Sequence, residues 1–192
     1  LTNMSVCYNV NNTVFGLTNY LFSNLRCNAA KTAFNFNGYI EGIFCSHCLA
    51  VAVNVGFYAR PGQAVPYLGL SQSHIDFFNA GVDIQYISQG SFVGNLLYHR
   101  SDATTNGVCY NIALGAGQNQ IIGGECLNAS TAPTTLVGVN FDNSSNNTVA
   151  DMVLSKVDTG VKNVNGSTGN IYRRGQWINI PAGAGEFGNG GS

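Results

Sequence analysis

The densest run of chemically active side chains in the sequence is Tyr98-His99-Arg100-Ser101-Asp102, in the segment "LYHRSDATTN". A carboxylic acid and an imidazole can transfer protons, and an arginine can orient the carboxylate of an acidic sugar. Cleavage or binding of a sugar chain is therefore one interpretation of this run. The other is a solvated corner in a chain that must place its few charges somewhere.

Stacking of neighbouring segments can extend this cluster, with His74 and Asp76 from "SQSHIDFF" and Glu125 from "IIGGECLN". Glycoside cleavage usually needs two carboxylates roughly 5 to 9.5 Å apart. Equivalent positions on adjacent stacked strands are about 4.8 Å apart, which brings such pairs within reach. The catalytic candidates are Asp76, Asp83, Asp102 and Glu125, and the substrate-binding candidates are His74, Tyr98, His99 and Arg100.

Asp83 lies in the alternating stretch "GVDIQYI", where Val82 and Ile84 are expected to point inward and Asp83 outward. The predicted register places Cys109 at the equivalent position one turn later and Gly138 two turns later. Asp83 then has no carboxylate on the next turn. A catalytic partner for it must come from a loop, such as that of Asp102, or from an earlier turn.

Binding a glycan without cleaving it requires only contact groups and no pair of catalytic carboxylates. Nine Tyr, eleven Phe and one Trp supply flat apolar faces, and Asn, Gln, Ser and Thr supply neutral hydrogen-bonding groups suited to a glycan. The nine acids form no clustered set that would hold Ca²⁺, and no GxSxG nucleophile elbow is present. We expect neither a metal nor another cofactor.

Composition excludes several classes of partner. Charged residues make up 9% of the 192 residues and the net charge is −1, so no basic stripe is available to neutralise the phosphates of a nucleic acid. No segment approaches the ~18 consecutive apolar residues of a membrane-spanning helix. Because Glu and Lys are scarce, the chain is also poor in helix-stabilising pairs, which favours an all-β fold.

The six cysteines are ambiguous. An even number suits a disulfide framework, but a chain of this length does not need one. Cys45-Ser-His-Cys48 resembles half of a zinc site, yet no second half follows and the pair sits in an apolar run. Buried thiols that pack as small apolar residues are the favoured interpretation.

The elements that position these residues repeat along the chain. Two stretches match without gaps at an offset of 79 residues. The matched pairs are Leu70 with Val149, Ser73 with Met152, Ile75 with Leu154, Phe78 with Val157 and Val82 with Val161. Gly-Val steps begin at residues 81, 107 and 160, one and two periods apart, and six strand-like segments recur at intervals of roughly 18 to 29 residues.

This periodicity predicts a solenoid, in which each unit shares its apolar face with its neighbours. Asn and Gly mark its corners because they tolerate the left-handed backbone conformation. An antiparallel sandwich is the alternative. The tetrapeptide NNTV occurs at residues 11–14 and 146–149, an interval of five periods, and we expect it at equivalent corners of the first and penultimate turns.

The repeats "NAGVDIQYISQG", "SFVGNLLYHR", "NQIIGGECLNAS" and "NNTVADMVLSKVDTGVKN" resemble those of the right-handed parallel β-helix proteins of the pectate-lyase-like group, above all bacteriophage tailspikes. The resemblance covers residues 9 to about 172 and includes no catalytic signature. It implies a side-by-side homotrimer on a phage virion, outside the cell, that recognises capsule or O-antigen polysaccharide. The family also includes polysaccharide hydrolases and lyases. The chain is expected to be a fragment or minimal member.

The sequence thus predicts an all-β, single-stranded right-handed parallel β-helix of about six coils over residues 1–172, followed by a C-terminal cap and Gly-rich tail over 173–192. In the cap, Arg173, Arg174 and the sole tryptophan close the open end or contact a sugar or a subunit. The expected function is recognition of a bacterial surface polysaccharide. Its alternatives are a glycosidase or lyase and a purely structural stalk.

Overall fold

The computed structural model describes residues 4–12, 18–38, 41–62 and 65–179. Within these residues the chain forms β-strands joined by turns and contains no helix. None of them forms a helix long and apolar enough to cross a membrane. The predicted all-β class is confirmed.

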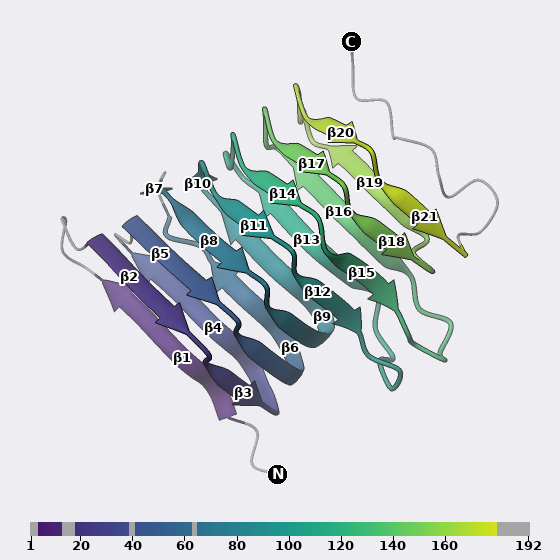
Figure 1. Cartoon of the computed structure of the whole chain (residues 1–192), viewed down its shortest axis with the longest axis horizontal. Helices are drawn as coiled ribbons and strands as arrows, with labels where there is room; N and C mark the ends of the chain where they lie inside the picture. The colour runs from purple at the N-terminus through teal and green to yellow at the C-terminus, as the bar shows by residue number, and fades with distance from the viewer. Residues whose placement is uncertain (1–3, 13–17, 39–40, 63–64, 180–192) are drawn as a thin grey trace.

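Two parallel sheets face each other, and the strands of each sheet are stacked along the long axis of the molecule (Figure 1). Sheet A consists of β1 (Met4–Asn12), β3 (Arg26–Asn28), β4 (Ala30–Gly38), β6 (Leu49–Ala59), β9 (His74–Gln85), β12 (Leu96–His99), β13 (Gly107–Ala113), β15 (Glu125–Asn128), β16 (Leu136–Asp142), β18 (Val153–Ser155), β19 (Thr159–Val164) and β21 (Gln176–Ile178). Sheet B consists of β2 (Thr18–Ser23), β5 (Glu41–Ser46), β8 (Leu68–Ser71), β11 (Ser91–Val93), β14 (Gln120–Ile122), β17 (Thr148–Ala150) and β20 (Ile171–Arg173). A short pair, β7 (Val65–Pro66) and β10 (Ile87–Ser88), lies at one corner.

Each turn of the chain pairs in parallel with the turn before and the turn after it. Equivalent residues on successive turns are 22 residues apart at Ser73 and Asn95, and 29 apart at Gly90 and Asn119. The stack makes about six turns and is a parallel β-solenoid. The predicted offset of 79 residues corresponds to three turns, because Leu70 and Val149 occupy one column of sheet B through β11 and β14.

One left-handed residue per turn bends the chain from sheet B into sheet A. These residues have φ values of 46 to 64° and are Asn24, His47, Gln72, Gly94, Gly123, Asp151 and Arg174. The backbone N–H of Gln72 donates to Val93 O at 2.9 Å, and that of Gly94 donates to Ile122 O at 2.9 Å. The corner therefore continues the hydrogen-bond ladder of the strands.

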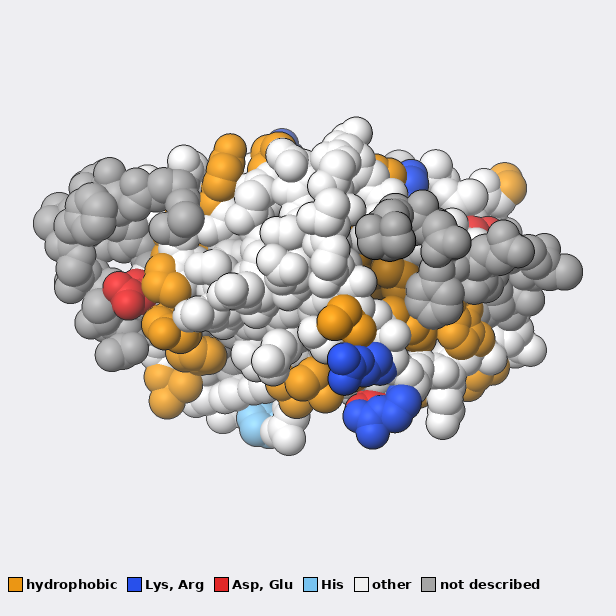
Figure 2. Space-filling view, turned by 90° about the horizontal axis from the view of Figure 1, so that it is seen from above, with side chains coloured by type: hydrophobic (Ala, Val, Ile, Leu, Met, Phe, Trp, Pro, Cys, Tyr) orange, Lys and Arg blue, Asp and Glu red, His pale blue; other side chains and the backbone are white. Residues whose placement is uncertain are grey.

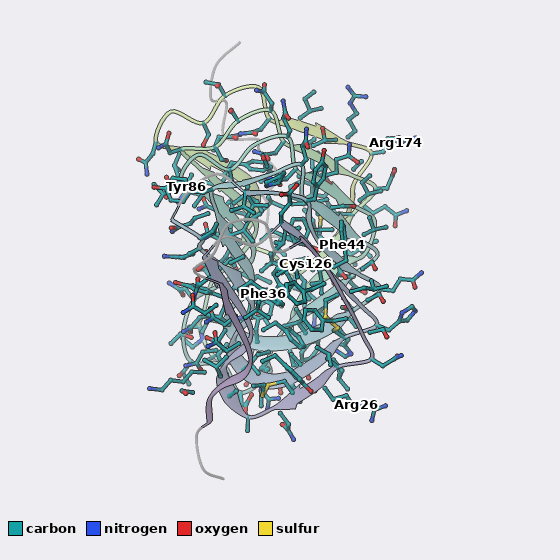
Figure 3. All side chains as sticks on the ribbon, turned by 90° about the vertical axis from the view of Figure 1, so that its left-hand side faces the viewer. Arg26, Phe36, Phe44, Tyr86, Cys126 and Arg174 are labelled. Carbon is teal, nitrogen blue, oxygen red and sulfur yellow. A yellow bond between two sulfur atoms is a disulfide. The ribbon has the colours of Figure 1, made fainter. Side chains whose placement is uncertain are left out.

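The core lies between the sheets and is built from alternate side chains. Toward the N-terminus it is largely aromatic, with Phe36 and Phe57 ring centroids 4.9 Å apart and Phe57 and Phe92 6.3 Å apart. Toward the C-terminus it is largely aliphatic, with buried Leu154 and Val161 among others. Figure 3, which looks into the N-terminal end, labels Phe36 inside the solenoid.

The Gly-Val repeat has a packing cause. A Cβ atom at Gly81 would meet the Leu97 side chain, and one at Gly160 would overlap the ring of Trp177, so each glycine makes room for a bulky residue on the next turn. The step predicted at Gly107 is wrong, because the register places Cys109 and Tyr110 beside Gly81 and Val82. Cys109 replaces the glycine there because it is bonded to the facing residue, Cys126.

All six cysteines form disulfides: Cys7–Cys27, Cys45–Cys48 and Cys109–Cys126. The prediction of free buried thiols is therefore wrong, although five of the six cysteines are almost fully buried. The bonds link inward-facing residues that meet only when the chain has gone round the solenoid or turned its corner. Their spacing in the sequence alone does not reveal this.

The two NNTV segments are not equivalent. Asn11 and Asn12 lie inside β1 and pair with Asn37 and Gly38 of sheet A, whereas Asn146 turns the corner into β17 of sheet B with φ 56°. Thr13 and Val14 lie outside the described residues. The five-period match is therefore coincidental. The second copy does carry structure, since buried Asn147 accepts hydrogen bonds from the backbone and side chain of Asn119 one turn earlier.

The stack continues through the predicted cap. β20 contains Arg173, and β21 contains Trp177, which pairs with Leu154 and packs partly buried against the core. Arg174 pairs with Asp151 on the turn before it, at 3.1 Å. Residues 180–192 of the predicted tail lie outside the described part of the chain.

Candidate functional site

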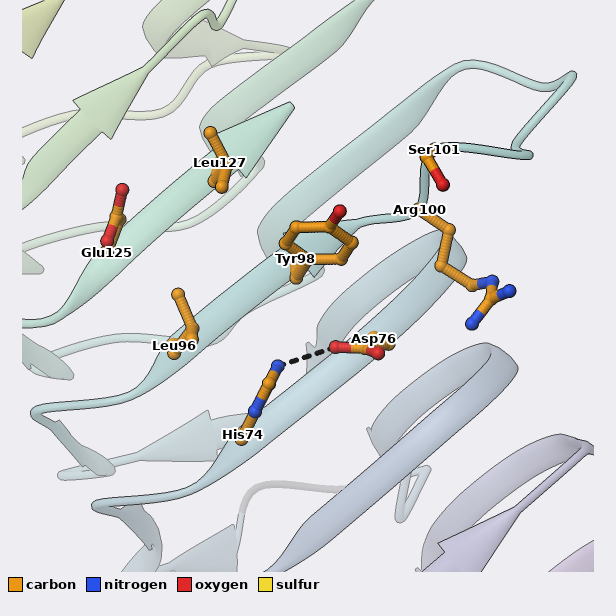
Figure 4. Close-up of a pocket in the computed structure, with 8 residues that line it drawn as sticks. All are labelled: His74, Asp76, Leu96, Tyr98, Arg100, Ser101, Glu125 and Leu127. Carbon is orange, nitrogen blue, oxygen red and sulfur yellow. Dashed lines mark ion pairs between the residues drawn. The ribbon is translucent and has the colours of Figure 1, made fainter. Parts of the chain in front are cut away.

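An open groove of about 470 Å³ lies on the outer face of sheet A, across β9, β12 and β15 (Figure 4). Charged side chains are otherwise sparse on the surface, as one flank of the molecule illustrates (Figure 2). The groove is lined by His74, Asp76, Leu96, Tyr98, Arg100, Ser101, Glu125 and Leu127. Five of the eight predicted site residues therefore come together, from three successive turns.

Strand alternation explains this lining. In β12 the buried Leu97 and His99 alternate with Leu96 and Tyr98, which are only partly buried and face outward. The register then aligns Leu96 with His74 and Glu125, and Tyr98 with Asp76 and Leu127. The groove floor is a two-column grid in which Tyr98 lies between Asp76 and Leu127.

His74 and Asp76 form a close pair at one corner of the groove. The Nε2 atom of His74 lies 2.6 Å from Oδ1 of Asp76, and both atoms are shielded from solvent. Neither atom has another hydrogen-bond partner among the described residues, although the angles of the contact are not those of an ideal hydrogen bond. Among the described residues, these two side-chain atoms therefore have only each other as a close polar contact.

Arg100 and Asp102 form the second pair. Nε and Nη2 of Arg100 donate to the two carboxylate oxygens of Asp102 at 2.8 and 3.0 Å, a bidentate geometry. These bonds raise the pKa of Arg100 and lower the pKa of Asp102 below its usual value. The negative charge of Asp76 also raises the pKa of Arg100.

Glu125 is the remaining acid of the groove and has no cationic partner among the described residues. It lies at the opposite corner from Asp76 (Figure 4). Two strand spacings and a two-residue offset separate them, so their Cα atoms are roughly 12 Å apart. Asp76 and Glu125 are thus not adjacent carboxylates on neighbouring rungs.

The structure places the other three predicted residues away from the groove lining. His99 is fully buried, with Nδ1 3.0 Å from Asn128 Oδ1 and Nε2 3.0 Å from the carbonyl oxygen of Phe78. Asp102 faces a separate hollow beyond Arg100. Asp83 lies further along β9, where it accepts a 2.6 Å hydrogen bond from Arg60.

The predicted neighbours of Asp83 are wrong by two residues. Asn111 and Asn140, rather than Cys109 and Gly138, follow it on the next two turns. Asn111 donates to Asp83 at 3.0 Å and Asn140 donates to Asn111 at 2.8 Å. Asp83 therefore begins an amide ladder and is satisfied by its neighbours.

The run after His99 forms a loop over residues 100–106, as its composition suggests, and a second loop over 129–135 lies against it on the next turn. Thr131 donates from its backbone N–H and its hydroxyl to the carbonyl oxygen of Ser101, and Ser130 donates to that of Ala103. The second loop thereby supports the first. Elsewhere a single left-handed residue, such as Ala29 or Lys156, makes the same connection.

Sequence reasoning missed Leu96 and Leu127, which supply the apolar part of the lining. The signal was available, because each leucine occupies the outward phase of a strand beside a buried neighbour, Leu97 or Cys126. Leu96 and Leu127 thereby add two part-buried apolar side chains to an otherwise mainly polar lining.

Comparison of the chain with protein-family models, curated proteins and solved structures found no match in any of the three. The parallel solenoid fold is established by the strand pairing itself. The closer resemblance to tailspikes and pectate-lyase-like proteins has no support from these comparisons and stays a prediction.

Proposed function

We propose that this chain binds a bacterial cell-surface polysaccharide, capsule or O-antigen, in the groove of sheet A. The observation that carries the proposal is the position of Tyr98, a partly exposed ring flanked by Asp76 on one side and Leu127 on the other. A sugar ring has apolar C–H faces and a rim of hydroxyls. Tyr98 and the leucines can pack against the faces, while Arg100 and the carboxylates hydrogen-bond the rim.

Binding is a better account of the groove than cleavage. A hydrolase uses a pair of carboxylates flanking the scissile bond, whereas Asp76 and Glu125 lie two strands apart with a two-residue offset rather than on neighbouring rungs. Two of the predicted catalytic acids are also each held by an arginine, Asp83 by Arg60 and Asp102 by Arg100, and Asp76 is in close contact with His74. Glycosidase or lyase activity is therefore the second hypothesis, and it can be tested by assaying for cleavage products.

We further propose an extracellular setting, on the tail of a phage virion. Three disulfides support it, because such bonds persist in oxidising compartments and on virion surfaces. The parallel solenoid is the fold that the tailspike resemblance implies, and we propose the right-handed coil on that resemblance alone. A structural stalk without ligand would share both features, so only binding separates the two.

A side-by-side homotrimer is the proposed assembly, with the outer face of sheet B at the contact between copies. Leu21 is 78% exposed on β2, and Phe44 and Val93 are each 39% exposed on β5 and β11. Within the strands of sheet B only Glu41 and Arg173 are charged, and they lie toward opposite ends of the stack. A face with few charges and several exposed apolar side chains suits self-association of identical copies.

An array of purified capsular and O-antigen polysaccharides tests the central proposal. We expect saturable binding to at least one preparation, and Tyr98→Ala should weaken it by more than about tenfold, as for an aromatic anchor. Tyr67→Ala is the matched control, a truncation of an exposed tyrosine outside the groove lining and outside the strands of sheet B, and should leave binding to an immobilised glycan unchanged. Equal binding by the Tyr98 variant would contradict the proposal.

The same preparations distinguish the alternatives in solution. New reducing ends would indicate hydrolysis, and absorbance near 235 nm would indicate elimination. Product that disappears in Asp76→Asn or Glu125→Gln would replace the binding proposal with an enzymatic one. Neither binding nor product would favour the stalk.

A further inference from the structure

A second hollow of about 310 Å³ adjoins the groove on the outer face of sheet A. It is lined by Asn54, Phe78, Asn79, Asp102, Thr104 and Thr105, from β6, β9 and the 100–106 loop. Thr105 donates to Oδ1 of Asn79 at 2.8 Å, which fixes the loop over the strand. Apart from Asp102, these polar groups are neutral amides and hydroxyls around one aromatic ring.

Arg100 connects the two depressions. It lines the groove, and its guanidinium lies 5.1 Å from the ring centroid of Phe78, which lines the second hollow. Its bidentate partner, Asp102, also lines the second hollow. A ligand that crosses from one depression to the other must therefore pass over the Arg100–Asp102 pair.

The joined surface is negatively charged whatever the state of its histidine. It holds three carboxylates, on Asp76, Asp102 and Glu125, against the cations of Arg100 and, when protonated, His74. Each cation is already in contact with a carboxylate. Glu125 alone is uncompensated, so an acidic sugar would meet a like charge and find no free cation to pair with.

We propose that the second hollow is a further subsite of the groove and that the joined site takes an uncharged sugar chain. Glu125 is the group that excludes uronic and other acidic sugars. This inference rests on the proposed function, since it names the class of glycan bound. It also separates this site from lyase sites, which must neutralise the carboxylate of a uronate.

The test of charge uses acidic polysaccharides of the array printed beside their carboxyl-reduced forms, which keep the linkages and lose the charge. The wild-type protein should bind reduced forms or naturally neutral chains at least about fivefold more tightly than acidic parents at low salt. This difference should shrink in 1 M NaCl because salt screens the repulsion. Glu125→Gln should remove most of it, whereas Glu41→Gln, an exposed acid on sheet B, should not.

The second hollow is tested by chain length, with oligosaccharides cut from a bound polysaccharide. Asn54→Ala should weaken binding of long oligosaccharides several-fold and leave the shortest bound fragment unaffected. Gln120→Ala, an exposed amide on sheet B, is the control. An equal loss at every length, or none, would overturn the second subsite.

The outcomes separate the two proposals. Wild-type binding to acidic chains that is lost on carboxyl reduction would overturn the inference and leave glycan binding intact. An unchanged preference in Glu125→Gln would overturn the role of Glu125. Binding to no glycan on the array would remove both the proposed function and the inference.

Discussion

The outer faces of the two sheets are built from the same turns of the same chain, yet they differ in kind. Sheet A carries the His74–Asp76 pair on β9 and the pair between Asp83 of β9 and Arg60, which directly follows β6, and the Arg100–Asp102 pair projects from a loop beside it. Sheet B presents Ser, Gln and Thr together with exposed apolar side chains, and no ion pair among its described residues.

This difference shows that charged residues in a solenoid can be concentrated on one outer face. Because every turn needs the same inward pattern, only the outward positions are free to vary. Seven of the nine charged residues within the described strands of the two sheets are on sheet A, and two long loops, 100–106 and 129–135, interrupt that sheet. This distribution is the basis for our proposals that a ligand binds on sheet A and that copies of the chain meet on sheet B.

The largest expected effect concerns the disulfides beneath the two faces. Removing Cys109–Cys126 by paired alanine substitutions opens a loop with a separation of 17 residues, and should lower the free energy of unfolding by about 3 kcal/mol on the loop-entropy model. Removing Cys45–Cys48, whose separation is 3 residues, should cost about 2 kcal/mol. Denaturant titration of both variants measures the difference. A larger loss for Cys45–Cys48 would contradict this order.

Phe44→Asp should disrupt assembly without affecting the groove. One charge per copy on the sheet B face would repel its equivalents and remove an exposed apolar ring, raising the dissociation constant of the oligomer by more than about tenfold. Sedimentation velocity over a range of concentrations measures this. Circular dichroism checks that the fold is retained. An unchanged oligomer would exclude this face as the contact.

Asp83→Asn tests whether every ion pair of sheet A belongs to the site. The substitution removes the charge paired with Arg60, and because Arg60 is about one-third exposed the loss of stability should be about 1 kcal/mol or less. Glycan binding should not change, since Asp83 lies outside both hollows. If Asp83→Asn weakened glycan binding as much as Tyr98→Ala, the binding site would have to include Asp83, further along β9.

The smallest effect is the pH dependence of the Arg100–Asp102 pair. Since the pKa of Asp102 is lowered in the folded chain, the pair stabilises the fold at neutral pH and loses this contribution as the pH falls through that value. The difference in unfolding free energy between wild type and Asp102→Asn should therefore shrink on acidification. It should be small throughout, because the Asp102 side chain is 59% exposed. A difference that grows toward acid would contradict the sign.

Periodicity in the sequence was sufficient to predict the solenoid and its number of turns, because inward positions are constrained by packing. The predicted register was wrong at the turn where a different residue fills the position that glycine occupies elsewhere. At Cys109 a disulfide replaces the glycine that Gly81 and Gly160 provide, so the predicted register moved by two residues and misplaced the neighbours of Asp83. The match of NNTV was misleading because Asn suits both a corner and an outer ladder.

The candidate site was predictable as far as polar clusters on successive turns could be stacked. Tyr98, Arg100, His74, Asp76 and Glu125 do share one groove. His99 could not be placed, because whether it points inward depends on the strand phase of β12, which ends just before a loop. The turn of Asp102 toward Arg100 was equally hidden, since loop conformation is set by contacts with the 129–135 loop on the next turn.

Hydroxyl-radical footprinting with and without a bound polysaccharide is the most direct test of whether the glycan binds on the outer face of sheet A rather than on that of sheet B. The account predicts that the glycan protects Tyr98, Leu96 and Leu127 from oxidation, and that Leu21 and Val93 on sheet B are oxidised equally in both samples. Protection of Leu21 and Val93, with Tyr98 unprotected, would place the ligand on sheet B and contradict the account.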